Sequence, residues 1–177
     1  MTTLELSRRD FLRAGSAASL FLAGGAMTAS LAGCSSPKTP ANGFQALRDG
    51  DLQLLRPLVP VIVPHAKSDA EVDTALHLLD DLMALSSETT RGQFFQLYDL
   101  LQLGAARWWL TGFWSAPEKL SAEERLQALE HWASKDSSFA RIAFFGLTKP
   151  FHMTWYAHGD HGLAVGYPGP PKKKVNA

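Results

Sequence analysis

Apolar residues recur at spacings of three and four along most of the chain, which is the period of an amphipathic helix. Ser68 and Glu71 have the spacing of a capping box, and Ser121 and Glu124 repeat it further along. Each box precedes an apolar stripe, and the first stripe runs through Val72, Ala75, Leu76, Leu79, Leu82 and Met83. Two helices are therefore predicted, one beginning after Ser68 and the other after Ser121.

Three further segments are less regular. Residues 89–110 are apolar on more than one face, which predicts one long central helix that ends at Gly112. Residues 44–64 predict a short helix capped by Asp51 and then an extended or kinked stretch, because Pro57 and Pro60 intervene. A buried strand over 59–63 is the alternative for that stretch, although proline disfavours a central strand.

The last predicted helix begins near Ser137 and contains Pro150, which is expected to kink or break it. No segment shows the alternation of a half-buried strand. The predicted fold is all-α, a compact bundle of about five helices. Residues 44–177 would form this single domain, with an irregular tail rich in proline and glycine at its C-terminal end.

The N-terminal segment has a different pattern. Arg8 and Arg9 are followed by Phe11 and Leu12, then by an Ala/Gly/Ser-rich apolar run that ends in Leu-Ala-Gly-Cys34. This order resembles a twin-arginine export signal with a lipoprotein processing box. Residues 1–33 would then be removed, and 34–43 would form a lipidated cysteine and a flexible tether. An ordinary amphipathic N-terminus that contains two arginines by chance is the alternative.

Export by this route would place the chain in the periplasm, held to a bacterial membrane by lipid on Cys34. The twin-arginine route carries folded proteins, mostly those that take up a cofactor in the cytoplasm or subunits that escort them. The chain should therefore either hold a cofactor or accompany a protein that does.

The composition of the chain excludes several kinds of ligand and cofactor. The chain has 17 basic and 17 acidic residues, a balance that does not suit nucleic-acid binding. Cys34 is the only cysteine, so an intrachain disulfide, a covalent haem and a cysteine-bound metal cluster are excluded. The sequence contains no glycine-rich phosphate-binding motif and no nucleophile elbow. No cofactor is therefore expected in this chain, nor an activity of its own.

Two sets of residues are candidates for a site. His158, Asp160 and His161 are weak candidates for metal binding, although a polar loop at an interface is the preferred interpretation of this region. Aromatic residues and prolines near chain turns are candidates for partner binding, because Trp and Tyr are enriched among interface anchors. Filling of the helical core is the alternative for Trp114, Trp155 and Tyr167. The partner-binding candidates are Trp114, Trp155, Tyr156, Tyr167, Pro168 and Pro170.

The layout resembles the small-subunit family typified by subunit 3 of membrane-bound gluconate 2-dehydrogenase. The likeness rests on the twin-arginine start, on Val61-Ile62-Val63-Pro64, and on the ending Thr154-Trp155-Tyr156 followed by Gly166-Tyr167-Pro168-Gly169-Pro170-Pro171. Only the signal is a specific motif. The lipoprotein box at Cys34 departs from many members of the family, which are released or held only by their partners.

The resemblance implies a subunit without a known cofactor. In that family it accompanies a large FAD-dependent subunit of the glucose-methanol-choline (GMC) oxidoreductase type, often with a cytochrome c subunit that carries haem c, and it supplies the signal read by the twin-arginine translocase. The expected function is thus a non-catalytic escort of a sugar or alcohol dehydrogenase. The alternative is an independent helical lipoprotein enzyme, or a ligand or metal carrier, that uses residues 152–161.

Overall fold

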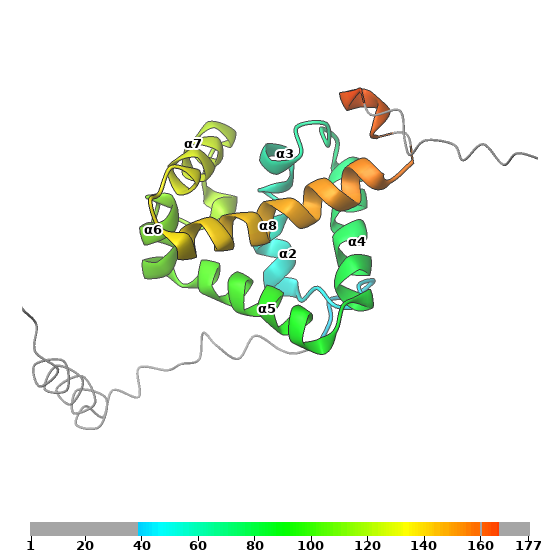
Figure 1. Ribbon diagram of the computed structural model, residues 1–177, viewed down its shortest axis with the longest axis horizontal. Coiled ribbons are helices and arrows are strands. Elements are labelled where there is room, and N and C mark those ends of the chain that lie inside the picture. Colours follow the sequence, from blue (N-terminus) through cyan, green and yellow to red (C-terminus); the bar gives the residue numbers. More distant parts are fainter. Residues whose placement is uncertain (1–38, 160, 167–177) are drawn as a thin grey trace, which may run out of the picture. The chain divides into compact units, whose positions relative to one another are not determined.

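The computed structural model describes residues 39–159 and 161–166. Within them the regular elements are all helical, which confirms the all-α class (Figure 1). The α-helices are α2 (Asp49–Leu55), α3 (Val59–Ile62), α4 (Asp69–Leu85), α5 (Glu88–Gln102), α6 (Gly104–Thr111), α7 (Ala122–Ala133) and α8 (Ser138–Ala157). Two 3-10 turns, Pro117–Lys119 and Leu163–Val165, complete the described elements.

Several predictions concern residues outside the described part of the chain. These are the signal residues Arg8, Arg9, Phe11 and Leu12, the lipidation site Cys34, the weak metal candidate Asp160, and the partner-binding candidates Tyr167, Pro168 and Pro170. They stay predictions.

Both capping boxes form as the sequence predicts. The Ser68 hydroxyl accepts the Glu71 N–H at the start of α4, and the Glu71 carboxylate accepts the Ser68 N–H at 2.8 Å. These contacts, led by the Ser68 N–H, hold the pKa of Glu71 below its ordinary value. Ser121 and Glu124 make the same exchange at the start of α7. Local polar spacing thus fixes where both helices begin.

The proline-containing segment differs from the prediction. The first helix, α2, begins after Arg48 rather than at Asp51. Residues 59–62, expected to lie in an extended or kinked stretch or in a strand, form the short helix α3, in which Pro60 lies in the first turn. Proline is tolerated there because the N–H groups of a first helical turn have no partner within the helix. The expectation of an extended stretch over these residues was therefore wrong.

The long helix predicted over 89–110 is two helices, α5 and α6, separated by an extended residue, Leu103. The Arg107 guanidinium explains the break, because it donates to the carbonyl oxygens of Leu101 at 2.9 Å and Gln102 at 3.2 Å. The same group donates to the carbonyl of Trp114 at 2.6 Å. Gly112 ends α6 in the left-handed conformation, as predicted.

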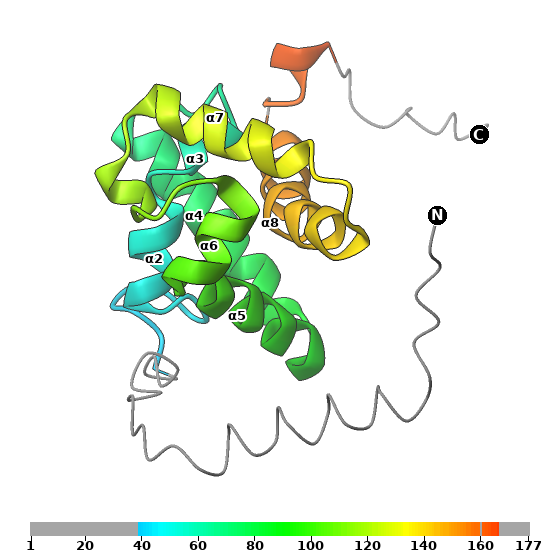
Figure 2. The same cartoon turned by 90° about the vertical axis from the view of Figure 1, so that its left-hand side faces the viewer.

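Helix α8 crosses the described domain from α6 and α7 at one end to α4 at the other (Figure 1). Figure 2 views the same helix nearly along its axis. Its 20 residues continue through Pro150, so the proline does not break the helix. Pro150 is buried between two core residues, Leu147 and Phe151, whose packing offsets the lost backbone hydrogen bond. The inner face of α8 completes the core with Ala140, Ala143, Leu147, Phe151 and Trp155.

Candidate docking groove

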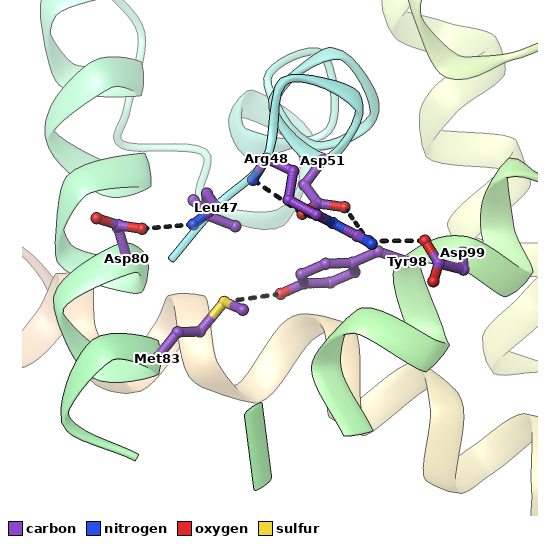
Figure 3. Close-up of polar contacts among 7 residues, drawn as sticks. All are labelled: Leu47, Arg48, Asp51, Asp80, Met83, Tyr98 and Asp99. Atoms are coloured by element: carbon purple, nitrogen blue, oxygen red, sulfur yellow. Dashed lines mark hydrogen bonds and ion pairs between the residues drawn. The ribbon is translucent and has the colours of Figure 1, made fainter. Parts of the chain in front are cut away.

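A buried polar network fixes the start of the domain on α4 and α5 (Figure 3). The Asp80 carboxylate accepts three backbone N–H groups, from Gln45 at 2.7 Å, Ala46 at 2.9 Å and Leu47 at 2.7 Å. Its neighbour Asp81 accepts from the Gln45 side-chain amide at 2.9 Å. The two carboxylates therefore act separately, and both tie the entering chain to α4.

Arg48 is the second centre of this network. Its guanidinium donates to Asp51 at 2.8 Å and to Asp99 on α5 at 2.7 Å, and it lies 4.5 Å from the centre of the Phe95 ring. The hydrogen bond to Asp51 is the largest reason that the pKa of Arg48 is raised. Because these charges already have partners inside the protein, the network is structural and offers no free group to a ligand.

A different environment lies between α5 and α8. There an open groove, here called the α5–α8 groove, has a volume of about 790 Å³. The end of α4 contributes Leu82 and Ser86 to it. The rest of the lining comes from Thr90, Gln93, Phe94, Gln96, Leu97 and Leu100 of α5 and from Phe139, Ile142, Ala143, Phe145, Gly146, Lys149, Pro150 and Met153 of α8.

The groove exists because α8 is apolar on a second face. Phe139, Ile142 and Met153 remain 55%, 73% and 66% exposed, although they recur at helical spacing like core residues. Gly146 lies between them, where an added Cβ would be 3.3 Å from the Leu97 Cδ2. The missing side chain thus lets α8 approach α5 closely within the groove. The result is an unpartnered apolar face about four helical turns long.

Five of the residues that line the groove are polar, namely Ser86, Thr90, Gln93, Gln96 and Lys149. The Ser86 hydroxyl donates to the Leu82 carbonyl at 2.7 Å, and the Thr90 hydroxyl lies 3.0 Å from the Ser87 hydroxyl. Lys149 is the one charged residue among the described residues that line the groove, and its ammonium lies 4.8 Å from the centre of the Phe145 ring. Such a surface suits another apolar protein surface with an acidic side chain placed near Lys149.

The structure separates the predicted partner-binding residues. Trp114 is 60% exposed and stacks on Trp108 with ring centres 5.5 Å apart. Trp155 is 2% exposed and belongs to the core, so its side chain is not at the surface. Tyr156 is half-buried, with its hydroxyl 3.2 Å from His65 Nδ1. Of these three residues, only Trp114 presents most of its side chain to solvent.

The groove residues Phe139, Ile142 and Met153 were not predicted as a site. The signal that could have found them is the excess of apolar residues on α8, which exceeds one helical stripe. The sequence showed this excess but not which face of α8 the core would cover.

The described histidines between residues 152 and 161 make contacts within the protein. His158 and His161 have ring centres 5.5 Å apart, but His161 Nδ1 lies 3.1 Å from the Trp155 carbonyl and its ring stacks on Trp155. His152 Nε2 lies 2.7 Å from the Ile62 carbonyl. Across the described ranges, no three His, Cys, Asp or Glu side chains gather as metal ligands would.

In the part of the chain that the structure describes, every helix is too short or too polar to cross a membrane. Comparison with known proteins gives no further identification, since no family model, no curated protein and no solved structure matches the chain.

Proposed function

We propose that the chain is a non-catalytic small subunit that escorts a flavin-dependent dehydrogenase of the GMC type through the twin-arginine route. After export it holds that enzyme in a periplasmic complex. The observation that carries this proposal is the α5–α8 groove, a large apolar surface left open on a folded domain.

Soluble monomers rarely leave a large contiguous apolar patch open to water, and such patches mark sites of interaction. In this domain four of the exposed large apolar side chains line one groove, and these are Phe139, Ile142, Phe145 and Met153 on its α8 wall. An escort needs such a surface, because it must bind its cargo before export and keep it afterwards. The groove therefore favours a binding subunit.

The parts of the proposal that concern export, membrane anchoring and the partners rest on the sequence. Arg8 and Arg9 would be read by the twin-arginine translocase, and lipid on Cys34 would anchor the complex to the membrane. The redox chemistry would belong to the partners, with FAD in the large subunit and haem c in an accompanying cytochrome. This assignment follows the resemblance to the small subunits of gluconate 2-dehydrogenase type.

An independent enzyme or carrier built on residues 152–161 has less support. His152 and His161 each approach a backbone carbonyl within hydrogen-bond distance, and the ring of His161 is covered by Trp155. These contacts give both rings a role in the packing of α8.

The test is the location of the partner enzyme. Replacing Arg8 and Arg9 with Lys keeps the charge but removes the paired guanidinium groups, so dehydrogenase activity should stay in the cytoplasm. Cys34→Ala is the matched control, because the complex should then reach the periplasm but leave the membrane fraction. Normal periplasmic dehydrogenase activity in the double Lys variant would contradict the escort function.

A further inference from the structure

We propose that the α5–α8 groove receives one amphipathic helix of the partner, with its apolar stripe in the groove and a carboxylate side chain facing Lys149. The inference rests on the proposed function only for the identity of the partner. The nature of the docking element follows from the shape, the chemistry and the charge of the groove.

The shape fits a helix. From Phe139 to Met153 the exposed face of α8 extends over 14 residue steps, or about 21 Å at the helical rise of 1.5 Å per residue. Helix α5 forms the opposite wall, and Gly146 keeps the two walls close. A third helix laid between two others is a common mode of peptide recognition, with apolar anchors every three or four residues.

The chemistry disfavours a small polar ligand. Sites for such ligands place a few polar groups so that they converge on one point. In this groove the hydroxyls of Ser86 and Thr90 already contact neighbouring groups, and the ammonium of Lys149 lies over Phe145. The remaining polar side chains of the lining are the amides of Gln93 and Gln96, both on α5, and the other eleven lining residues are apolar. A row of apolar side chains fills such a surface better than a compact polar molecule does.

The positive charge of Lys149 favours acidic residues on the flank of the partner's helix. Helix α8 carries Arg141 and Lys149 and contains no carboxylate, and no acidic residue lines the groove among the described residues. A carboxylate on the docking helix would meet an unopposed cation. A second copy of this chain would instead bring another Lys149 and no carboxylate, since a two-fold interface joins identical patches and no acidic residue is among the described residues that line this one. The concave form also differs from the protruding apolar side chains that insert into a lipid surface.

Photo-crosslinking on the full chain in its producing cells tests the inference. Ile142→p-benzoylphenylalanine and Met153→p-benzoylphenylalanine place the reactive group in the groove, at positions whose exposure tolerates the change. Leu126→p-benzoylphenylalanine on α7 is the matched control outside the groove. Both groove positions should crosslink to one amphipathic helical segment with acidic residues on its flank, and Leu126 should not.

A charge reversal at Lys149 tests the acidic contact directly. Lys149→Glu should lower the crosslinking yield by at least about tenfold, because like charges opposed at an interface are strongly unfavourable. Lys119→Glu, an exposed change away from the groove, should leave the yield within about twofold, since exposed charges contribute little. An unchanged yield with Lys149→Glu would overturn the acidic contact.

The outcomes separate the two proposals. An acidic helix in a protein without flavin would support the docking mode and contradict the escort function. Crosslinks to lipid, to a second copy of this chain, or to a basic or non-helical segment would overturn the docking mode, as would a yield no higher than that of the Leu126 control. The escort function would then still be decided by the location of dehydrogenase activity in the double Lys variant.

Discussion

The two faces of α8 have similar composition and opposite environments. The inner face, with Leu147, Phe151 and Trp155, is almost completely buried against the rest of the domain. The outer face, with Phe139, Ile142 and Met153, remains open along the α5–α8 groove. Since both faces are apolar, hydropathy alone does not distinguish a core from a docking surface. What distinguishes them is whether the chain itself supplies the covering residues.

The largest expected losses of stability come from substitutions on the inner face of α8, whether they open a cavity or bury a charge. Phe151→Ala should lower the free energy of unfolding by about 3–5 kcal/mol, because it opens a cavity in a closed core. Phe139→Ala removes the same atoms from the outer face and should cost less than about 1 kcal/mol, since that side chain is already half in water. Urea unfolding of both full-chain variants measures the difference, and equal losses would remove the distinction between the faces.

The next largest loss of stability is expected in the buried polar network around Asp80. Asp80→Ala should cost about 3 kcal/mol, because it leaves backbone N–H groups of Gln45, Ala46 and Leu47 without their acceptor. Asp81→Ala, its exposed neighbour, should cost less than about 0.5 kcal/mol. The same unfolding measurement applies. If the two variants were equally stable, the entering chain would not depend on Asp80.

A smaller effect should appear at high pH. Burial raises the pKa of Tyr98 well above its ordinary value, so the folded state keeps the phenol protonated after the unfolded state has lost its proton. This contribution is complete below about pH 10, the ordinary pKa of tyrosine, and is lost as the pH rises further. Stability should therefore fall above that pH, and Tyr98→Phe should reduce the fall. Phenolate absorbance from all three tyrosines in the folded chain would contradict the prediction.

The smallest effect on stability belongs to the groove. Ile142→Glu combined with Met153→Glu should change the free energy of unfolding by less than about 1 kcal/mol, because exposed substitutions are usually within 0.5 kcal/mol each. Leu147→Glu on the inner face should instead unfold the domain, since it buries an unpaired charge. Circular dichroism during urea unfolding gives both results. A large loss in the groove variant would place those residues in the core.

The features predicted correctly from the sequence are those that depend on residues close together in the chain. The capping boxes at Ser68 and Ser121 mark the starts of α4 and α7, because their partners lie three residues away. The break between α5 and α6 could not be predicted in this way, since it depends on Arg107 reaching the carbonyls of both Gln102 and Trp114. Local spacing therefore fixes where these helices start, and a tertiary contact fixes where the long segment divides.

Contacts between residues that are far apart in the sequence were even harder to predict. Arg48 meets Asp99 51 residues away, and neither residue stands out in the pattern of apolar positions. The groove has the same origin, because its openness depends on which α8 face the other helices cover. Trp155 shows the consequence, since it was a candidate for partner binding with core filling as the alternative, and the fold places its side chain in the core.

The central proposal is that a flavoprotein partner binds the open face of α8. The direct measurement is the bound flavin that copurifies with the full chain, compared between Ile142→Glu/Met153→Glu and the surface control Leu126→Glu. We predict that the groove variant loses at least about tenfold of the flavin, as substitution of central interface residues does, while the control retains it. Equal flavin in both variants, or none with the unchanged chain, would contradict the account.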